Sequence, residues 1–169
     1  CVRHDFTSAY EGLHELIGKL GGMDLYFHSS GIGWENCSLD AEKEMRTVQT
    51  NAVGFTRMVL SAYQWFADNA HRGRIACITS IARTRGLGAA PAYSATKRYQ
   101  SHYLECLAQL ASMRRLPIAI TDIRPHSRCP TLFPSCGSTD PCRASWLPTL
   151  SLAAISRCNS RLSTWRRTS

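Results

Sequence analysis

Three stretches of the first 125 residues carry apolar side chains at the three- and four-residue spacing of an amphipathic helix. The first follows the potential cap Thr7 and ends before a Gly-Gly pair. The second starts at the potential cap Asp40 and runs to Trp65. The third covers residues 92–115 and carries an apolar and aromatic stripe, formed by Tyr99, Tyr103, Leu107 and Leu110. The pattern therefore predicts three helices, of which the second and third are long.

Short apolar runs between these helices predict buried strands. They cover residues 23–28, 75–80 and 118–122, and Pro117 directly precedes the last run. Strands that alternate with helices imply a parallel sheet with right-handed crossovers. The sequence therefore predicts an α/β fold, a doubly wound parallel sheet with flanking helices, and 169 residues suit one such unit.

Tyr93 and Lys97 are the residues that point most directly to chemistry. Residues four apart share a helix face, so a helix that begins near Ala92 projects the phenol and the ammonium into one cleft. A cation beside a phenol favours the phenolate form, which a group that exchanges a proton with an alcohol or carbonyl oxygen requires. Ser80 ends the strand predicted at 75–80, and ligands of open α/β sheets bind outside such strand ends. Ser80 is therefore placed to donate a hydrogen bond to a substrate oxygen in the same crevice.

Four stretches between Asp5 and Pro125 together resemble the classical short-chain dehydrogenase/reductase family. They are residues 21–33, residues 51–54, residues 78–80 with residues 93–97, and residues 121–125. Each candidate residue alone also fits an ordinary structural role, such as a strand-end cap for Ser80 or a solvated charge for Lys97. Their order, spacing and flanking elements carry the resemblance. It implies an incomplete Rossmann-like domain over residues 1–125.

The resemblance implies a role for each matching residue. Tyr93 would be the general acid/base, and Lys97 would perturb it and hold the nicotinamide ribose. Ser80 would position the substrate carbonyl, and Asn51 would hold a water that links Lys97 to solvent. The implied catalytic residues are Asn51, Ser80, Tyr93 and Lys97. The implied cofactor-binding residues are Ser30, Gly31, Asn51, Tyr93, Lys97 and Pro125.

The function that the resemblance implies is NAD(P)-dependent interconversion of a small-molecule alcohol and a ketone or aldehyde by hydride transfer. The hydride is the chemistry of NAD or NADP, and the choice between them cannot be read from this sequence. The family's first strand and glycine-rich turn, which hold the pyrophosphate, have no counterpart, because Gly31-Ile32-Gly33 follows an internal strand. We therefore expect a partial chain, and the alternative function is an inactive fragment or pseudoenzyme that cannot bind cofactor.

The resemblance also implies a homo-oligomer, a dimer or tetramer, that assembles through the long helices. An apolar stripe buried in one domain has the same periodicity as a stripe buried between subunits. Core packing therefore stays open as the other explanation of the stripe.

The composition changes after Pro125. Residues 126–169 hold six Arg, no Lys and one acid, a net charge of +5 out of the +8 of the whole chain. They also hold four of the eight cysteines, and neither helical nor alternating periodicity continues. We expect an atypical basic tail that is disordered or that arises from a shifted reading frame. Its cysteine spacing and the absence of a reader motif predict neither a metal site nor a specific nucleic-acid partner.

The other four cysteines, Cys1, Cys37, Cys77 and Cys106, are expected to be reduced, partly buried residues of an intracellular protein. The sequence shows neither a secretory signal pattern nor a run that approaches the ~20 apolar residues of a membrane helix. We therefore expect a cytoplasmic location and no membrane partner.

Overall fold

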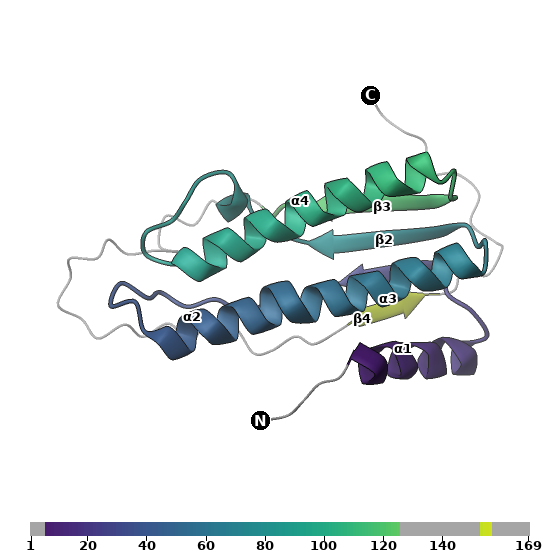
Figure 1. The fold of residues 1–169 in the computed structure, drawn as a ribbon, viewed down its shortest axis with the longest axis horizontal. Helices are drawn as coiled ribbons and strands as arrows, with labels where there is room; N and C mark the ends of the chain where they lie inside the picture. Colours follow the sequence, from purple (N-terminus) through teal and green to yellow (C-terminus); the bar gives the residue numbers. More distant parts are fainter. Residues whose placement is uncertain (1–5, 126–152, 157–169) are drawn as a thin grey trace.

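The computed structural model describes residues 6–125 and 153–156 of the chain (Figure 1). The elements in chain order are α1 (Phe6–Leu20), β1 (Leu25–His28), α2 (Ala41–Val48), the π-helix η1 (Gln49–Gly54), α3 (Phe55–Asp68), β2 (Gly73–Ile78), the 3₁₀-helix η2 (Ile81–Arg83), α4 (Pro91–Met113), β3 (Ile118–Ile123) and β4 (Ala153–Ser156). Apart from β4, the tail predicted over residues 126–169 lies outside the described residues.

The sheet has the strand order β3-β2-β1-β4. Strands β1, β2 and β3 are parallel, and His28 pairs with Cys77 while Ile78 pairs with Ile123. Parallel neighbours need a crossover connection, which α2 to α3 and then α4 provide. The predicted α/β class is therefore confirmed. Strand β4 adds an antiparallel neighbour to β1 that the sequence pattern does not predict.

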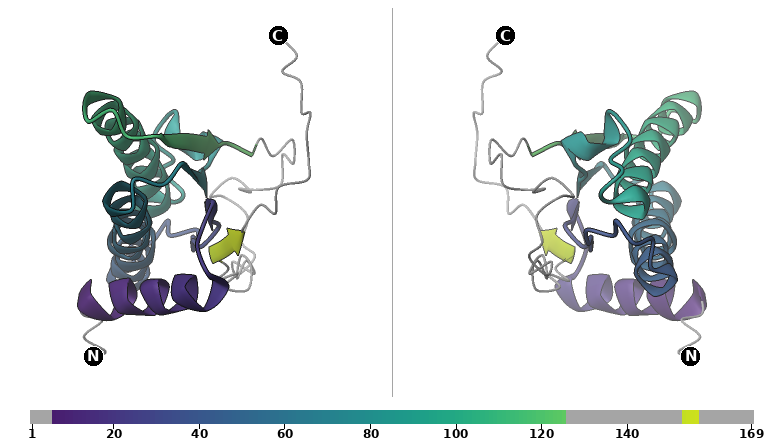
Figure 2. Two further views of the ribbon diagram at one scale, coloured as in Figure 1. Left: turned by 90° about the vertical axis from the view of Figure 1, so that its right-hand side faces the viewer. Right: turned by 90° about the vertical axis from the view of Figure 1, so that its left-hand side faces the viewer.

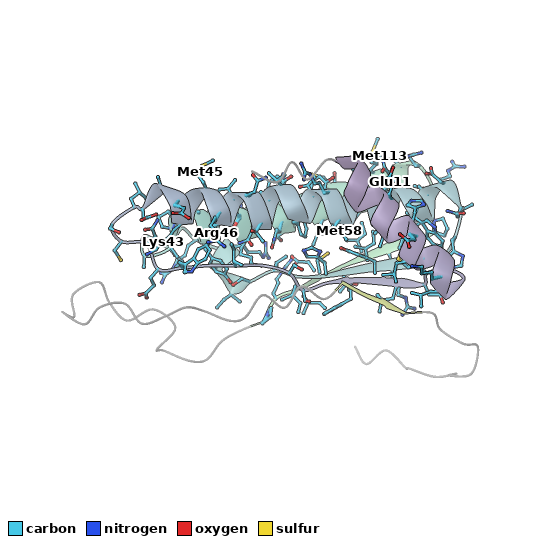
Figure 3. All side chains as sticks on the ribbon, turned by 90° about the horizontal axis from the view of Figure 1, so that it is seen from below. Glu11, Lys43, Met45, Arg46, Met58 and Met113 are labelled. Carbon is cyan, nitrogen blue, oxygen red and sulfur yellow. The ribbon has the colours of Figure 1, made fainter. Side chains whose placement is uncertain are left out.

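Two long helices lie side by side over one face of the sheet, and α1 crosses near the end of α3 (Figures 1 and 2). One is α4, and the other runs without a break through α2, η1 and α3. Asp40 begins this second helix as predicted, because its carboxylate accepts a hydrogen bond of 3.0 Å from the Lys43 amide. Met58 points from α3 toward the sheet, whereas Met45 and Met113 point away from it (Figure 3).

The core fills the space between these helices and the strands. Tyr26 and Ile75 come from the sheet, Phe55 and Phe66 come from α3, and all four are buried. Gly73 begins β2 directly beneath Phe66, because a Cβ atom built there would lie 2.1 Å from the Phe66 ring. Only glycine allows β2 and α3 to approach this closely.

Several strand boundaries differ from the predicted ones by one or two residues. Strand β1 begins at Leu25 and β2 covers Gly73–Ile78, so Ser80 lies beyond the end of its strand. Backbone pairing causes the shift, because Gly73 already pairs with Ile118 of β3. No helix within the described residues is long and apolar enough to cross a membrane.

The cysteine prediction needs two corrections. Cys77 and Cys106 are free, as expected, but Cys106 is exposed and Cys37 is disulfide-bonded. A disulfide depends on which cysteines the fold brings within about 7 Å between Cα atoms, and sequence spacing does not reveal that distance. Cys1 lies outside the described residues.

Candidate active site

The three parallel strands end at one edge of the sheet, and three predicted site residues follow these ends. Strands β1, β2 and β3 end at His28, Ile78 and Ile123. Each site residue lies two positions further along the chain, and the set is Ser30, Ser80 and Pro125. Open α/β sheets bind ligands outside the carboxyl ends of their strands. The predicted positions therefore gather at the edge where this class of fold binds ligands.

Contacts from neighbouring elements fix the start of α4 over this edge. Pro91 occupies the first turn, where its missing N–H costs nothing. The Ala92 amide donates a 3.0 Å hydrogen bond to the Glu44 carboxylate of α2, which supplies the cap that Ala90 lacks. The Ser94 hydroxyl donates to the carbonyl oxygens of Ala82 and Arg85. The residue between these anchors is Tyr93.

Tyr93 and Lys97 lie on the same face of α4, as their spacing predicts. The Lys97 ammonium nitrogen is 5.7 Å from the centroid of the Tyr93 ring, within the range of a cation–π contact. The ring packs against the loop after β1, because a Cβ atom on Gly33 would lie 2.5 Å from the Tyr93 Cδ2 atom. Glycine at position 33 therefore leaves the space that the Tyr93 ring occupies.

Lys97 is buried, with 5% of its surface exposed. Its Nζ atom donates hydrogen bonds to the Ile78 carbonyl oxygen at 3.4 Å and to the Gln100 side-chain oxygen at 3.0 Å. Burial lowers the pKa of Lys97 to about 8, although nearby Cys77 and Asp122 act in the opposite direction. An ammonium has three N–H donors, so one remains for a ligand.

Asn51 lies in the π-helix η1 and is fully buried. Its side-chain oxygen accepts a 2.9 Å hydrogen bond from the Ile32 amide, and its side-chain nitrogen donates to the Ile32 carbonyl at 2.7 Å and to the Thr96 hydroxyl at 3.2 Å. Asn51 therefore ties the loop after β1 to the start of α4. π-Helical turns inside α-helices are frequent at functional sites.

Gly31 lies close to the two buried polar side chains, Lys97 and Asn51. A Cβ atom at this position would lie 3.2 Å from the Lys97 Nζ atom and 3.5 Å from the Asn51 side-chain oxygen. Gly31 itself is exposed. A side chain at this position would occupy the space beside the Lys97 ammonium.

Ser80 caps η2 through its hydroxyl oxygen, which accepts a 3.1 Å hydrogen bond from the Ala82 amide. A serine that accepts in this way can still donate its proton. Within residues 11–125, no hydrogen bond joins Ser30, Ser80 or Pro125 to Tyr93 or Lys97. The structure thus brings Asn51, Gly31, Lys97 and Tyr93 together, and it places the other three residues at the same edge.

His28 belongs to this cluster, although no sequence motif predicted a role for it. Its Nδ1 atom lies 3.0 Å from the Tyr26 hydroxyl. Burial and the nearby Lys97 cation lower the pKa of His28 to about 4, so the imidazole is neutral at physiological pH. A neutral histidine adds no second positive charge beside Lys97.

Thr96 and Gln100 also contact the predicted site residues, although the sequence pattern did not predict them as part of the site. They accept from Asn51 and Lys97 respectively. The sequence contains one signal for Gln100, because it is a polar residue three positions after Lys97 and so shares its helix face. Thr96 carries no comparable signal.

A cavity of about 500 Å³ lies beside the loop that follows η2. Its lining includes Arg83, Arg85, Ser94 and Arg98. Neither Tyr93 nor Lys97 lines it, because Ser94 and Arg98 project from the next position around α4. The cavity therefore adjoins the Tyr93–Lys97 site without containing its reactive groups.

The residues at the strand edge fit the nicotinamide end of a dinucleotide cofactor. Lys97 has a donor left for a ribose hydroxyl, and Gly31 leaves room for a ligand to reach it. Backbone that closely approaches a ligand commonly uses glycine. The fit concerns the nicotinamide ribose alone.

Three parallel strands with helices between them, and polar residues at their carboxyl edge, are typical of open α/β folds, which bind ligands at that edge. A family model described as short chain dehydrogenase matches residues 2–128. The chain is 30% identical over 129 residues to an uncharacterized oxidoreductase of Myxococcus xanthus (strain DK1622), which covers 73% of this chain and 50% of that relative. The chain therefore belongs to the short chain dehydrogenase family, a family of oxidoreductases.

Solved structures show the same fold at lower identity. A short chain dehydrogenase from Mycobacterium smegmatis matches with a TM-score of 0.65 and 20% identity over 72% of this chain and 50% of that chain. A 3-ketoacyl-ACP reductase from Sinorhizobium meliloti 1021 matches with a TM-score of 0.63 and 23% identity over 73% of this chain and 49% of that chain. The chain thus spans about half the length of the relatives it matches.

Proposed function

We propose that this chain is the catalytic part of an NAD(P)-dependent oxidoreductase that interconverts a small-molecule alcohol and a ketone or aldehyde. The observation that carries the proposal is the contact between Tyr93 and the buried Lys97 ammonium at the carboxyl edge of the parallel strands. A phenol beside a buried cation is suited to exchange a proton with a substrate oxygen.

In this proposal Tyr93 is the general acid/base. Its hydroxyl gives a proton to the carbonyl oxygen during reduction and takes the proton from the alcohol during oxidation. The Lys97 ammonium stabilises the phenolate that remains after the proton has left. Ser80 donates a hydrogen bond to the same substrate oxygen and so orients it. NAD or NADP supplies or accepts the hydride when bound.

Cofactor binding at this edge is assigned to the predicted residues. Lys97 would donate its remaining N–H to a ribose hydroxyl, and the missing side chain of Gly31 would leave room for the ribose. Asn51 holds the backbone of Ile32, next to Gly31, in place with two hydrogen bonds. Ser30 and Pro125, two residues beyond the ends of β1 and β3, would border the nicotinamide.

The proposal includes a cytoplasmic homo-oligomer. Several large apolar side chains on α2 and α4 are exposed, and they are Met45, Val48, Tyr99, Leu110 and Met113. An interface through the long helices would cover these side chains, which is the support for the expected dimer or tetramer.

Cofactor binding and turnover test the proposal directly. NADH and NADPH fluorescence is followed on titration with the chain, and turnover is measured for the wild type, Tyr93→Phe and the matched control Tyr99→Phe on the exposed face of α4. We expect Tyr93→Phe to retain cofactor binding and to lose about 10²- to 10⁴-fold in turnover, because it removes the general acid/base. Tyr99→Phe should keep wild-type turnover.

Two results would contradict this proposal. Turnover that survives in Tyr93→Phe would show that Tyr93 is not the acid/base. A folded chain that binds neither NADH nor NADPH would support the alternative, an inactive fragment or pseudoenzyme that retains the catalytic residues.

A further inference from the structure

Gln100 is a fully buried amide that joins two of the candidate site residues. It lies on α4 three positions after Lys97 and has 0% of its surface exposed. Its side-chain oxygen accepts the 3.0 Å hydrogen bond from Lys97, and its side-chain nitrogen donates a 2.8 Å hydrogen bond to the main-chain carbonyl of Asn51. Both ends of one amide are therefore occupied by groups of the site.

Packing alone does not explain why an amide is buried at position 100. Burial of a glutamine costs free energy unless both ends of its amide find partners, and an apolar residue of similar size fills the same space without that requirement. The partners that satisfy Gln100 are an ammonium and a carbonyl whose own residues contact the ligand edge. We therefore connect the buried amide of Gln100 with the charge of Lys97 and not with the packing of the core.

The geometry points to Gln100 as a positioning residue that holds the Lys97 ammonium toward Tyr93 and ties it to the backbone of Asn51. This inference rests on the proposed function of Lys97 as the partner of Tyr93. The family resemblance assigns the connection between Lys97 and Asn51 to a water, whereas here a protein side chain makes it. An amide fixes the ammonium at a defined position, because it cannot rotate freely as a water does.

Other charged or titratable groups also face Lys97, and each belongs to a different element. They are His28 of β1, Cys77 of β2 and Asp122 of β3, with Tyr93 on α4 itself. None of these side chains changes in a Gln100 variant. A change in the proton affinity of Lys97 in such a variant therefore reports on the amide.

The test measures the titration of Lys97 by NMR in chains labelled with ¹³Cε-lysine. The sequence has only three lysines, and Lys19 and Lys43 are exposed, so the spectrum holds three signals of which one belongs to a buried lysine. The third signal, assigned by its loss in Lys97→Met, should titrate near the lower pKa of about 8.

Gln100→Met removes the hydrogen-bond acceptor of the ammonium. The Lys97 midpoint should fall by about one to two pH units, because a hydrogen bond to a charged group favours the charged form. Gln100→Glu places a carboxylate beside the ammonium and should raise the midpoint. Gln109→Glu makes the same charge change at an exposed position of α4 and should leave it unchanged.

An unchanged Lys97 midpoint in folded Gln100→Met and Gln100→Glu chains would overturn the inference. Unfolding of Gln100→Met would instead move the Lys97 midpoint up toward the ordinary lysine value of 10.5, and circular dichroism would reveal the unfolding. In that case the Lys97 midpoint in the isosteric Gln100→Glu variant alone tests the inference. The readout needs neither cofactor nor turnover. A failed NADH titration together with a shifted Lys97 would refute the proposed function and leave the Gln100 contact standing.

Discussion

Replacement of Lys97 by methionine removes a buried ammonium and so tests the electrostatics of the site through folding stability. The pKa of Lys97 falls from its ordinary value of 10.5 to about 8 in the folded chain. At roughly 1.4 kcal/mol per pH unit, the shift corresponds to about 3 kcal/mol by which the buried charge lowers the free energy of unfolding at neutral pH. Methionine has a similar length and no charge.

The pH dependence follows from which state binds the proton. Between pH 8 and 10.5 the unfolded chain still holds the lysine proton, whereas the folded chain has released it. The free energy of unfolding of the wild type therefore rises with pH in this window relative to Lys97→Met. Methionine also leaves the Gln100 side-chain oxygen without its donor, which costs about 1–3 kcal/mol at every pH. The difference between the variants at one pH is thus less informative than its slope.

Urea unfolding of both chains at several pH values from 7 to 11 measures this slope. The stability of Lys97→Met relative to the wild type should decline by about 3 kcal/mol across the series. Lys43→Met, which removes an exposed lysine of α2, should show no such decline. A flat difference for Lys97→Met, or one of opposite slope, would refute the reasoning that burial lowers the Lys97 pKa.

Three further predictions concern contacts around the site. Gly33→Ala places a Cβ atom 2.5 Å from the Tyr93 ring and should reduce turnover about 10²-fold. The control Gly88→Ala places its Cβ atom in open space and should retain wild-type turnover. Equal turnover of the two variants in steady-state assays would contradict this prediction. Gly73→Ala meets the Phe66 ring at 2.1 Å and should lower the free energy of unfolding by about 1–3 kcal/mol in urea, against a small effect for Gly86→Ala. Burial would raise the pKa of Asp122, but hydrogen bonds from Thr79, Ser101 and Arg124 lower it. Asp122 therefore stabilises the fold at pH values above its unfolded pKa of about 4, and this stabilisation is lost as the pH falls below that value. The stability advantage of the wild type over Asp122→Asn should therefore shrink in urea titrations below pH 4, and a constant difference would argue against it.

Helices were predictable because their signals are local. The predicted end of the third helix at residue 115 lies within two residues of the end of α4 at Met113, and Asp40 caps α2 as expected. The start of β2 depends on its pairing with β3, which is not a local property, and the boundary moved by two residues. Strand β4 depends on the free edge of β1, and four residues give no usable period.

In the candidate site, too, local relations were predictable from the sequence and long-range contacts were not. Tyr93 and Lys97 share a helix face because they are four residues apart, and this relation is visible in the sequence. The contacts of Asn51 with Ile32 and Gln100 join residues 19 and 49 positions apart. They also require the π-helical turn η1, which changes the hydrogen-bond register without changing the polarity pattern.

The energetics of Lys97 bear on whether this site serves chemistry or packing. A buried ammonium that lowers stability by about 3 kcal/mol is a large cost for a domain whose total stability is about 5–15 kcal/mol. Residues chosen for stability alone would place an apolar side chain at position 97. Around this lysine the chain instead places a glutamine with both amide ends engaged and a glycine that leaves the space beside the ammonium unfilled. A destabilising charge that is held in position in this way is typical of a functional site, where stability is lost for the sake of reactivity.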